Sequence, residues 1–221
     1  MYLEEGTRRV FAGAIDWPGW CRSARDEEGA ILALVEYAPR YAAALRRAAR
    51  GFTPPEDQAA FRVVERLEGN ASTDFGAPGI VPSSDERPVS QEELRRLTAL
   101  LKVCWRAFDR ATESASSKTL RKGPRGGGRD LDAIVSHVLE AEAAYTARLG
   151  GKHCRPGSPG AAEEMAAVRR AFLDAMGARA RGDPLPEGPR SRTVWPPRYG
   201  VRRSAWHALD HAWEIEDRAT D

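Results

Sequence analysis

Two histidines near the end of the chain, His207 and His211, have a spacing that suits metal binding. They lie in "SAWHALDHAWEIEDR", residues 204–218, where the sequence predicts a helix. Side chains four residues apart lie on one helix face, one turn from each other, so both imidazoles can reach one ion. Zinc and related divalent metals bind neutral imidazole nitrogen. The alternative is that both are ordinary residues of an amphipathic helix.

A third histidine, His137, lies in the apolar stretch "AIVSHVLEAEAAY" of another predicted helix. Ile134 and Ala141, each about one turn away, are apolar, so the imidazole is expected to face inward. Facing helices of a bundle are where such proteins build metal sites in their core. The alternative is a buried histidine with an ordinary hydrogen-bond partner. Both interpretations are open at this point.

Glu214 is a candidate catalytic residue beside the histidine pair. It lies three residues after His211 and seven after His207, so it shares their helix face. Its carboxylate could accept a proton in catalysis or orient a ligand histidine. It could also form an ion pair with Arg218, one turn further on.

A basic and glycine-rich stretch, "KTLRKGPRGGGR" at residues 118–129, is a candidate for anion binding. Glycines expose backbone N–H groups, and a neighbouring helix N-terminus favours anions. Arg125 and Arg129 could therefore hold the carboxylates of a thiol cofactor or of an acidic substrate. The alternative is a solvated basic loop, and the spacing is not that of a nucleotide-binding motif.

The composition is that of a globular protein with one large or two small domains. The chain has 221 residues, of which 42% are hydrophobic and 30% are charged. A net charge of +2 provides no general attraction for nucleic acid. No apolar run approaches the roughly 20 residues of a membrane helix, and no signal peptide is recognisable. We therefore expect a cytoplasmic protein that contacts neither nucleic acid nor membrane.

The first 70 residues are expected to form a small β-β-α-β domain. The segments "RRVFAGAID", "CRSA" and "FRVVERLEG" have strand patterns, and "YLEE" could form an additional leading strand. A helix is predicted to begin at Asp26, and Pro39 to kink or divide it. Residues 71–89 are rich in glycine, proline, serine and aspartate, so we predict an interdomain connection there.

The remainder, residues 90–221, is predicted to be all-helical. Ser90 begins a capping box at the start of the first helix, and Asp130 can cap the second. Pro197 suits the first turn of the last helix. Four helices of roughly similar length predict a bundle, so the fold class of the whole chain is α+β.

The N-terminal stretch "AIDWPGWCRSARDEEGAILAL" resembles the HicB-like antitoxin fold. The shared features are an Asp-x-Pro-Gly turn, a short strand and an acidic helix start. The resemblance covers about residues 1–70 and implies a partial ribonuclease-H-type fold. The sequence has no acidic cluster that would bind catalytic magnesium, so nuclease activity is not expected.

Residues 90–221 resemble the DinB-like metal-binding four-helix bundles. The shared features are a histidine within the second helix ("HVLEAEAAY"), a long connection before the last helix, and "WHALDHAWEIEDR". The resemblance implies that His137, His207 and His211 are the metal ligands. Zinc or nickel is the expected metal, and iron or manganese also suits three imidazoles.

Three protein nitrogens leave a coordination position open, which is typical of a catalytic site. The resemblance implies a thiol-dependent transferase or isomerase that acts on small electrophilic molecules. A low-molecular-weight thiol such as mycothiol or bacillithiol would be its cofactor, and a homodimer is expected. The alternative is a non-catalytic metal-binding protein, or an antitoxin-like protein whose first domain binds a partner.

Overall fold

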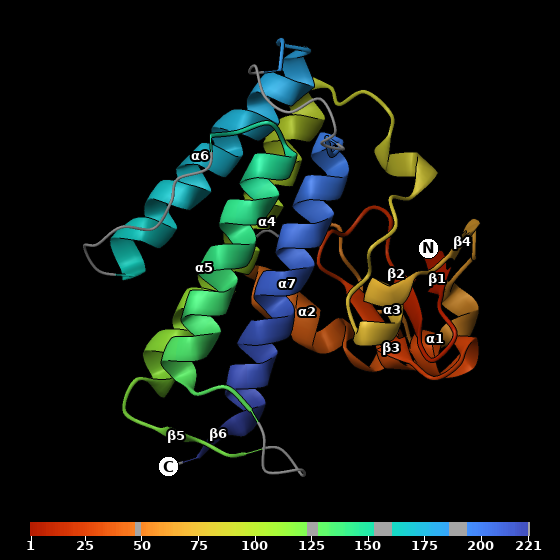
Figure 1. The fold of residues 1–221 in the computed structure, drawn as a ribbon. Coiled ribbons are helices and arrows are strands. Elements are labelled where there is room, and N and C mark those ends of the chain that lie inside the picture. Colours follow the sequence, from red (N-terminus) through yellow and green to blue (C-terminus); the bar gives the residue numbers. More distant parts are fainter. Residues whose placement is uncertain (47–49, 123–127, 153–160, 186–193, 221) are drawn as a thin grey trace. The chain divides into compact units, whose positions relative to one another are not determined.

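The structure is a computed structural model of an α+β protein. It describes residues 1–46, 50–122, 128–152, 161–185 and 194–220. A small N-terminal sheet is followed by a mostly helical part (Figure 1). The chain divides into two compact units, Met1–Arg87 and Pro88–Asp221. The predicted α+β class is therefore confirmed.

The first unit is built on a four-stranded sheet. Its strands are β1 (Tyr2–Glu5), β2 (Val10–Gly13), β3 (Cys21–Ala24) and β4 (Glu65–Glu68). The strand order is β3-β2-β1-β4, with β1 antiparallel to β2 and parallel to β4. Tyr2, Leu3 and Phe11 bury their side chains, which explains why "YLEE" is a central strand and not an accessory one.

Two helices follow β3, and both the predicted cap at Asp26 and the predicted division near Pro39 are present. These are α1 (Glu27–Glu36) and α2 (Ala38–Leu45). The Asp26 carboxylate caps α1 by accepting a hydrogen bond from the Gly29 N–H at 2.8 Å. Pro39 lies in the first turn of α2, where its missing N–H costs nothing, and the predicted helix is divided just before it. Two short 3-10 helices are η2 (Gln58–Ala60) and η3 (Ser83–Asp85).

Most of residues 71–89, expected as an interdomain connection, belongs to the first unit. This segment includes α3 (Ala71–Phe75). Glu4 on β1 is fully buried, and its carboxylate accepts hydrogen bonds from the Thr73 hydroxyl at 2.6 Å and the Gly79 N–H at 2.8 Å. A buried carboxylate requires such donors. The segment therefore packs on the sheet, for which its composition gave no signal.

The second unit consists mainly of four long helices that lie side by side (Figure 1). They are α4 (Gln91–Ala115), α5 (Leu131–Arg148), α6 (Ala161–Arg181) and α7 (Pro197–Arg218). Helix α7 packs against both α4 and α5, and α6 packs against α5. Two short strands, β5 (Thr119–Leu120) and β6 (Ala219–Thr220), pair antiparallel next to them. This pairing was not expected from the sequence.

The helix starts in this unit follow the predicted capping. The Ser90 hydroxyl caps α4 by accepting the Glu93 N–H at 3.2 Å, and the Asp130 carboxylate caps α5. Pro197 occupies the first turn of α7. The Glu93 carboxylate, however, forms an ion pair with Arg198 of α7. Glu93, the residue expected to complete the capping box, thus connects α4 with α7.

The core of the second unit includes an apolar stripe of α4. Leu97, Leu101, Cys104 and Phe108 are buried, and α7 is buried along most of its length. Burial raises the pKa of the Cys104 thiol to about 12, so this cysteine serves packing and not nucleophilic chemistry. None of the described helices has both the length and the apolar character needed to span a membrane.

Candidate metal centre

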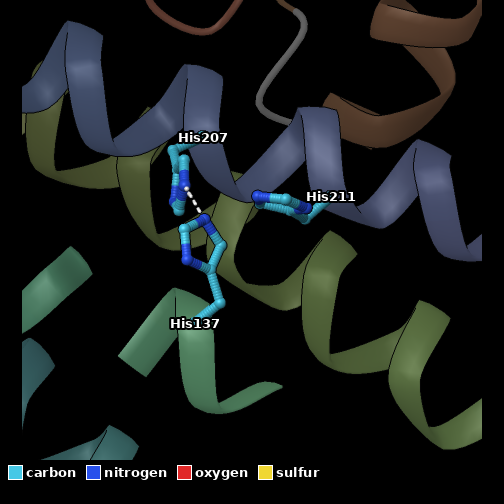
Figure 2. A group of neighbouring side chains, drawn as sticks. All are labelled: His137, His207 and His211. Atoms are coloured by element: carbon cyan, nitrogen blue, oxygen red, sulfur yellow. Dashed lines mark hydrogen bonds between the residues drawn. The ribbon is translucent and has the colours of Figure 1, made fainter. Parts of the chain in front are cut away.

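Three histidines from two helices come together in the second unit. His137 projects from α5, and His207 and His211 project from α7 toward it (Figure 2). The Nε2 atoms of His137 and His207 are 3.2 Å apart. One ligand nitrogen from each residue can be chosen so that all three lie within 4.8 Å of one another. We call these three residues the histidine cluster, and they could together hold a metal ion.

The helices fix this arrangement through their periodicity. The four-residue spacing places His207 and His211 on the buried face of α7, with ring centroids 4.6 Å apart. The ring of His137 lies 5.0 Å from each of them. His137 is only half-buried, whereas the other two are buried. The solvent-accessible side of the cluster is therefore at His137.

The electrostatics of the cluster favour neutral imidazoles at His137 and His207. Burial holds the pKa of His207 well below its ordinary value, and the neighbouring His211 and Arg203 lower it further. Burial also lowers the pKa of His137, with a contribution from the charge of Arg129. A metal ion binds the neutral form, in which one ring nitrogen has a free lone pair. His137 and His207 are thus in the protonation state that a metal requires.

Glu214 holds the third histidine in a defined orientation. Its carboxylate lies 2.8 Å from Nδ1 of His211 and also accepts a hydrogen bond from Arg218. The hydrogen bond with His211 is the main cause of its lowered pKa, so the group is ionised. An ionised acceptor at Nδ1 fixes the proton there and leaves Nε2 free as a ligand. The orienting contact and the ion pair are therefore both present, while proton transfer by Glu214 stays a prediction.

The geometry fits a first-row divalent metal. Imidazole nitrogens bind zinc at about 2.0–2.1 Å in tetrahedral geometry, so two ligand nitrogens of one ion lie about 3–3.5 Å apart. The separation of 3.2 Å between His137 and His207 already meets this condition. The most distant pair, at no more than 4.8 Å, would have to approach by up to about 1.5 Å to bind a tetrahedral ion. Three neutral imidazoles suit zinc, nickel, iron or manganese.

Comparisons of the chain with models of known families, with curated proteins and with solved structures found no match. What this site does is therefore inferred from its own residues and their surroundings.

Arg218 connects Glu214 to the turn that precedes α5. Besides the Glu214 carboxylate, its guanidinium donates to the carbonyl oxygens of Arg121 at 2.9 Å and Arg129 at 2.6 Å. Gly128 adopts a φ of 132°, and a Cβ atom there would lie only 2.7 Å from Nη2 of Arg218. The turn can approach Arg218 this closely because residue 128 has no side chain.

The two arginines expected to bind a cofactor differ in what the structure shows. Arg125 lies outside the described residues. Arg129 is exposed, and its backbone carbonyl accepts the hydrogen bond from Arg218. The charge of Arg129 contributes to the lowered pKa values of His137 and His207, so it acts on the cluster electrostatically. Its binding of a cofactor stays a prediction.

A buried polar group that sequence reasoning missed connects α5 with α4 and α7. Glu142 of α5 accepts hydrogen bonds from the Ser204 hydroxyl of α7 at 2.6 Å and the Trp105 indole N–H of α4 at 3.0 Å. Its other oxygen is buried and has no partner among the described residues. Burial raises its pKa. The sequence feature that indicates its burial is its position four residues after Val138 and eight after Ile134, on a buried apolar stripe.

Proposed function

We propose that the second unit is a DinB-like four-helix bundle that binds a divalent metal through His137, His207 and His211. The observation that supports this proposal best is the convergence of three imidazole nitrogens, from two helices, within 4.8 Å. The lowered pKa values of His137 and His207 favour the same role, as does the contact of the Glu214 carboxylate with His211. For the first unit we propose a HicB-like fold, supported by its order of strands and helices.

The proposed activity is that of a thiol-dependent transferase or isomerase acting on small electrophilic molecules. A divalent metal at the cluster would supply an activated nucleophile by lowering the pKa of a thiol or of water. The chain's own residues hold and orient this site. Glu214 keeps His211 in one tautomer, Arg218 fixes Glu214, and the packing of α7 excludes water from the buried side. Small molecules would approach at the half-buried His137.

The test of metal binding is elemental analysis of the purified full chain. We expect about one divalent ion per chain, and loss of the ion in the His207→Ala variant. His153→Ala is the matched control, because it removes the remaining histidine of the sequence and leaves the cluster intact. Equal metal content in all three proteins would refute the assignment. A metal-free chain that co-purifies with a small toxin would favour the antitoxin-like alternative.

Catalysis requires a separate measurement. The metal-loaded chain is assayed for transfer of small thiols to electrophiles, with and without a chelator. Chelator-sensitive turnover supports the proposed activity. A chain that binds one metal ion but gives no turnover with any thiol would be a non-catalytic metal-binding protein, and the enzymatic part of the proposal would be wrong.

A further inference from the structure

An arginine with an unmatched donor lies one helix turn before the histidine cluster. Arg203 is half-buried on α7, and its Nη1 is buried without a hydrogen-bond partner among the described residues. The guanidinium carbon lies 4.7 Å from the ring centroid of Trp206 and 5.6 Å from that of Tyr145. Both aromatic residues are themselves buried.

The same aromatic residues border the cluster. The ring of His207 lies 6.0 Å from the ring of Trp206 and 5.7 Å from that of Tyr145. Arg203, His207 and His211 follow one another at four-residue steps, so they form one row along α7. The guanidinium therefore belongs to the surroundings of the cluster, at the end nearer the start of α7.

The surroundings of Arg203 do not satisfy its hydrogen-bonding capacity. Aromatic faces attract a cation, but they do not replace an acceptor in the plane of the guanidinium. A buried donor without an acceptor costs about 1–3 kcal/mol. Guanidinium presents its donors as a planar fork that matches the two oxygens of a carboxylate. An anion such as a carboxylate would supply the missing acceptor at Nη1.

We propose that Arg203 binds the carboxylate of the small thiol on which the histidine cluster acts. This inference rests on the proposed function, and it narrows the substrate class to thiols that carry a carboxylate. One helix turn, about 5.4 Å along the axis, separates Arg203 from His207. Because Arg203 and His207 also lie near the same two aromatic rings, a ligand that contacts both would be a small thiol.

The probe is the full chain loaded with cobalt(II), whose absorption reports its own coordination and the arrival of a thiolate sulfur. We would titrate it with 3-mercaptopropionate and with the uncharged 3-mercaptopropionamide, following the sulfur-to-cobalt charge-transfer band. In the natural chain we expect the acid to bind about tenfold or more tightly than the amide. Arg203→Gln should bring this ratio close to one. Arg203→Lys, which keeps the charge but not the fork, should give an intermediate ratio.

Arg106→Gln is the matched control, because Arg106 is an exposed arginine on α4. It should leave the ratio unchanged. Equal affinity for acid and amide in the natural chain would overturn the inference without any variant, even if Arg203→Gln failed to fold. A preference that survives in Arg203→Gln would overturn it as well. Absence of a cobalt spectrum would instead refute the metal site, and the inference together with it.

Discussion

Replacing Glu142 by glutamine tests how a buried carboxylate affects stability. In the folded chain burial raises the pKa of this group above its ordinary value of 4.5. The folded state therefore keeps the proton to higher pH than the unfolded state does. The stabilisation linked to this proton is fully present below about pH 4.5 and is lost as the pH rises through the folded pKa. Each unit of elevation corresponds to about 1.4 kcal/mol.

Glutamine keeps an acceptor for Ser204 and Trp105 and has no charge at any pH. Its amide places a buried donor at the unpartnered oxygen position, at a cost of about 1–3 kcal/mol. In the natural chain below about pH 4.5, protonated Glu142 carries a similar unpaired O–H donor. We therefore expect nearly equal stability below about pH 4.5, and a growing advantage for Glu142→Gln as the pH rises.

The assay is urea unfolding of both proteins, followed by circular dichroism, at several values from about pH 4 to about pH 8. Glu140→Gln is the control, since Glu140 is exposed on the same helix, and its effect should vary little with pH. For a chain of this size, about 1 kcal/mol also corresponds to about 2–4 °C in Tm. A difference between Glu142→Gln and the natural chain that stays constant with pH, or favours glutamate at high pH, would refute the reasoning.

Three further outcomes are expected. Cobalt affinity should fall by no more than about tenfold between about pH 7.5 and about pH 6.5, because the lowered pKa values of His137 and His207 keep protons from competing at these two ligands; a steeper loss measured by titration would contradict those pKa shifts. Glu214→Gln should weaken metal binding about 10-fold to 100-fold in a competition titration, whereas the exposed Glu163→Gln on α6 should not, and equal affinities would remove the orienting role. Leu101→Ala should lower the free energy of unfolding by about 2–5 kcal/mol, whereas Leu185→Ala, at an exposed leucine, should change it by less than about 0.5 kcal/mol in the same urea assay.

Features with a local cause could be predicted from the sequence. The cap at Asp26, the division near Pro39 and the helix start at Pro197 each depend on the chemistry of one or two neighbouring residues. Helical periodicity also indicated that His137 faces inward and that His207 and His211 share one face, whereas the approach of His137 to that pair was implied by the resemblance to metal-binding bundles. For the histidines, the period of the helix indicates which side chains share a face.

Features that depend on distant partners could not be predicted. The parallel pairing of β1 with β4 joins residues more than 60 positions apart, and Glu4 finds its donors in a segment that looked like a connection. Glu142 and Arg203 have charged side chains, which are usually exposed, so residue type alone gave no reason to bury the carboxylate of Glu142 or Nη1 of Arg203. Their burial follows from the aromatic and helical neighbours that only the folded chain supplies.

The close approach of Gly128 to Arg218 has a consequence for anyone who would transplant this centre into another scaffold. The imidazoles belong to α5 and α7, but these two helices alone do not contain every contact that orients the imidazoles. A side chain at position 128 would displace the guanidinium that donates to Glu214, the carboxylate that orients His211. A working graft must therefore include the turn ahead of α5, although that turn donates no imidazole.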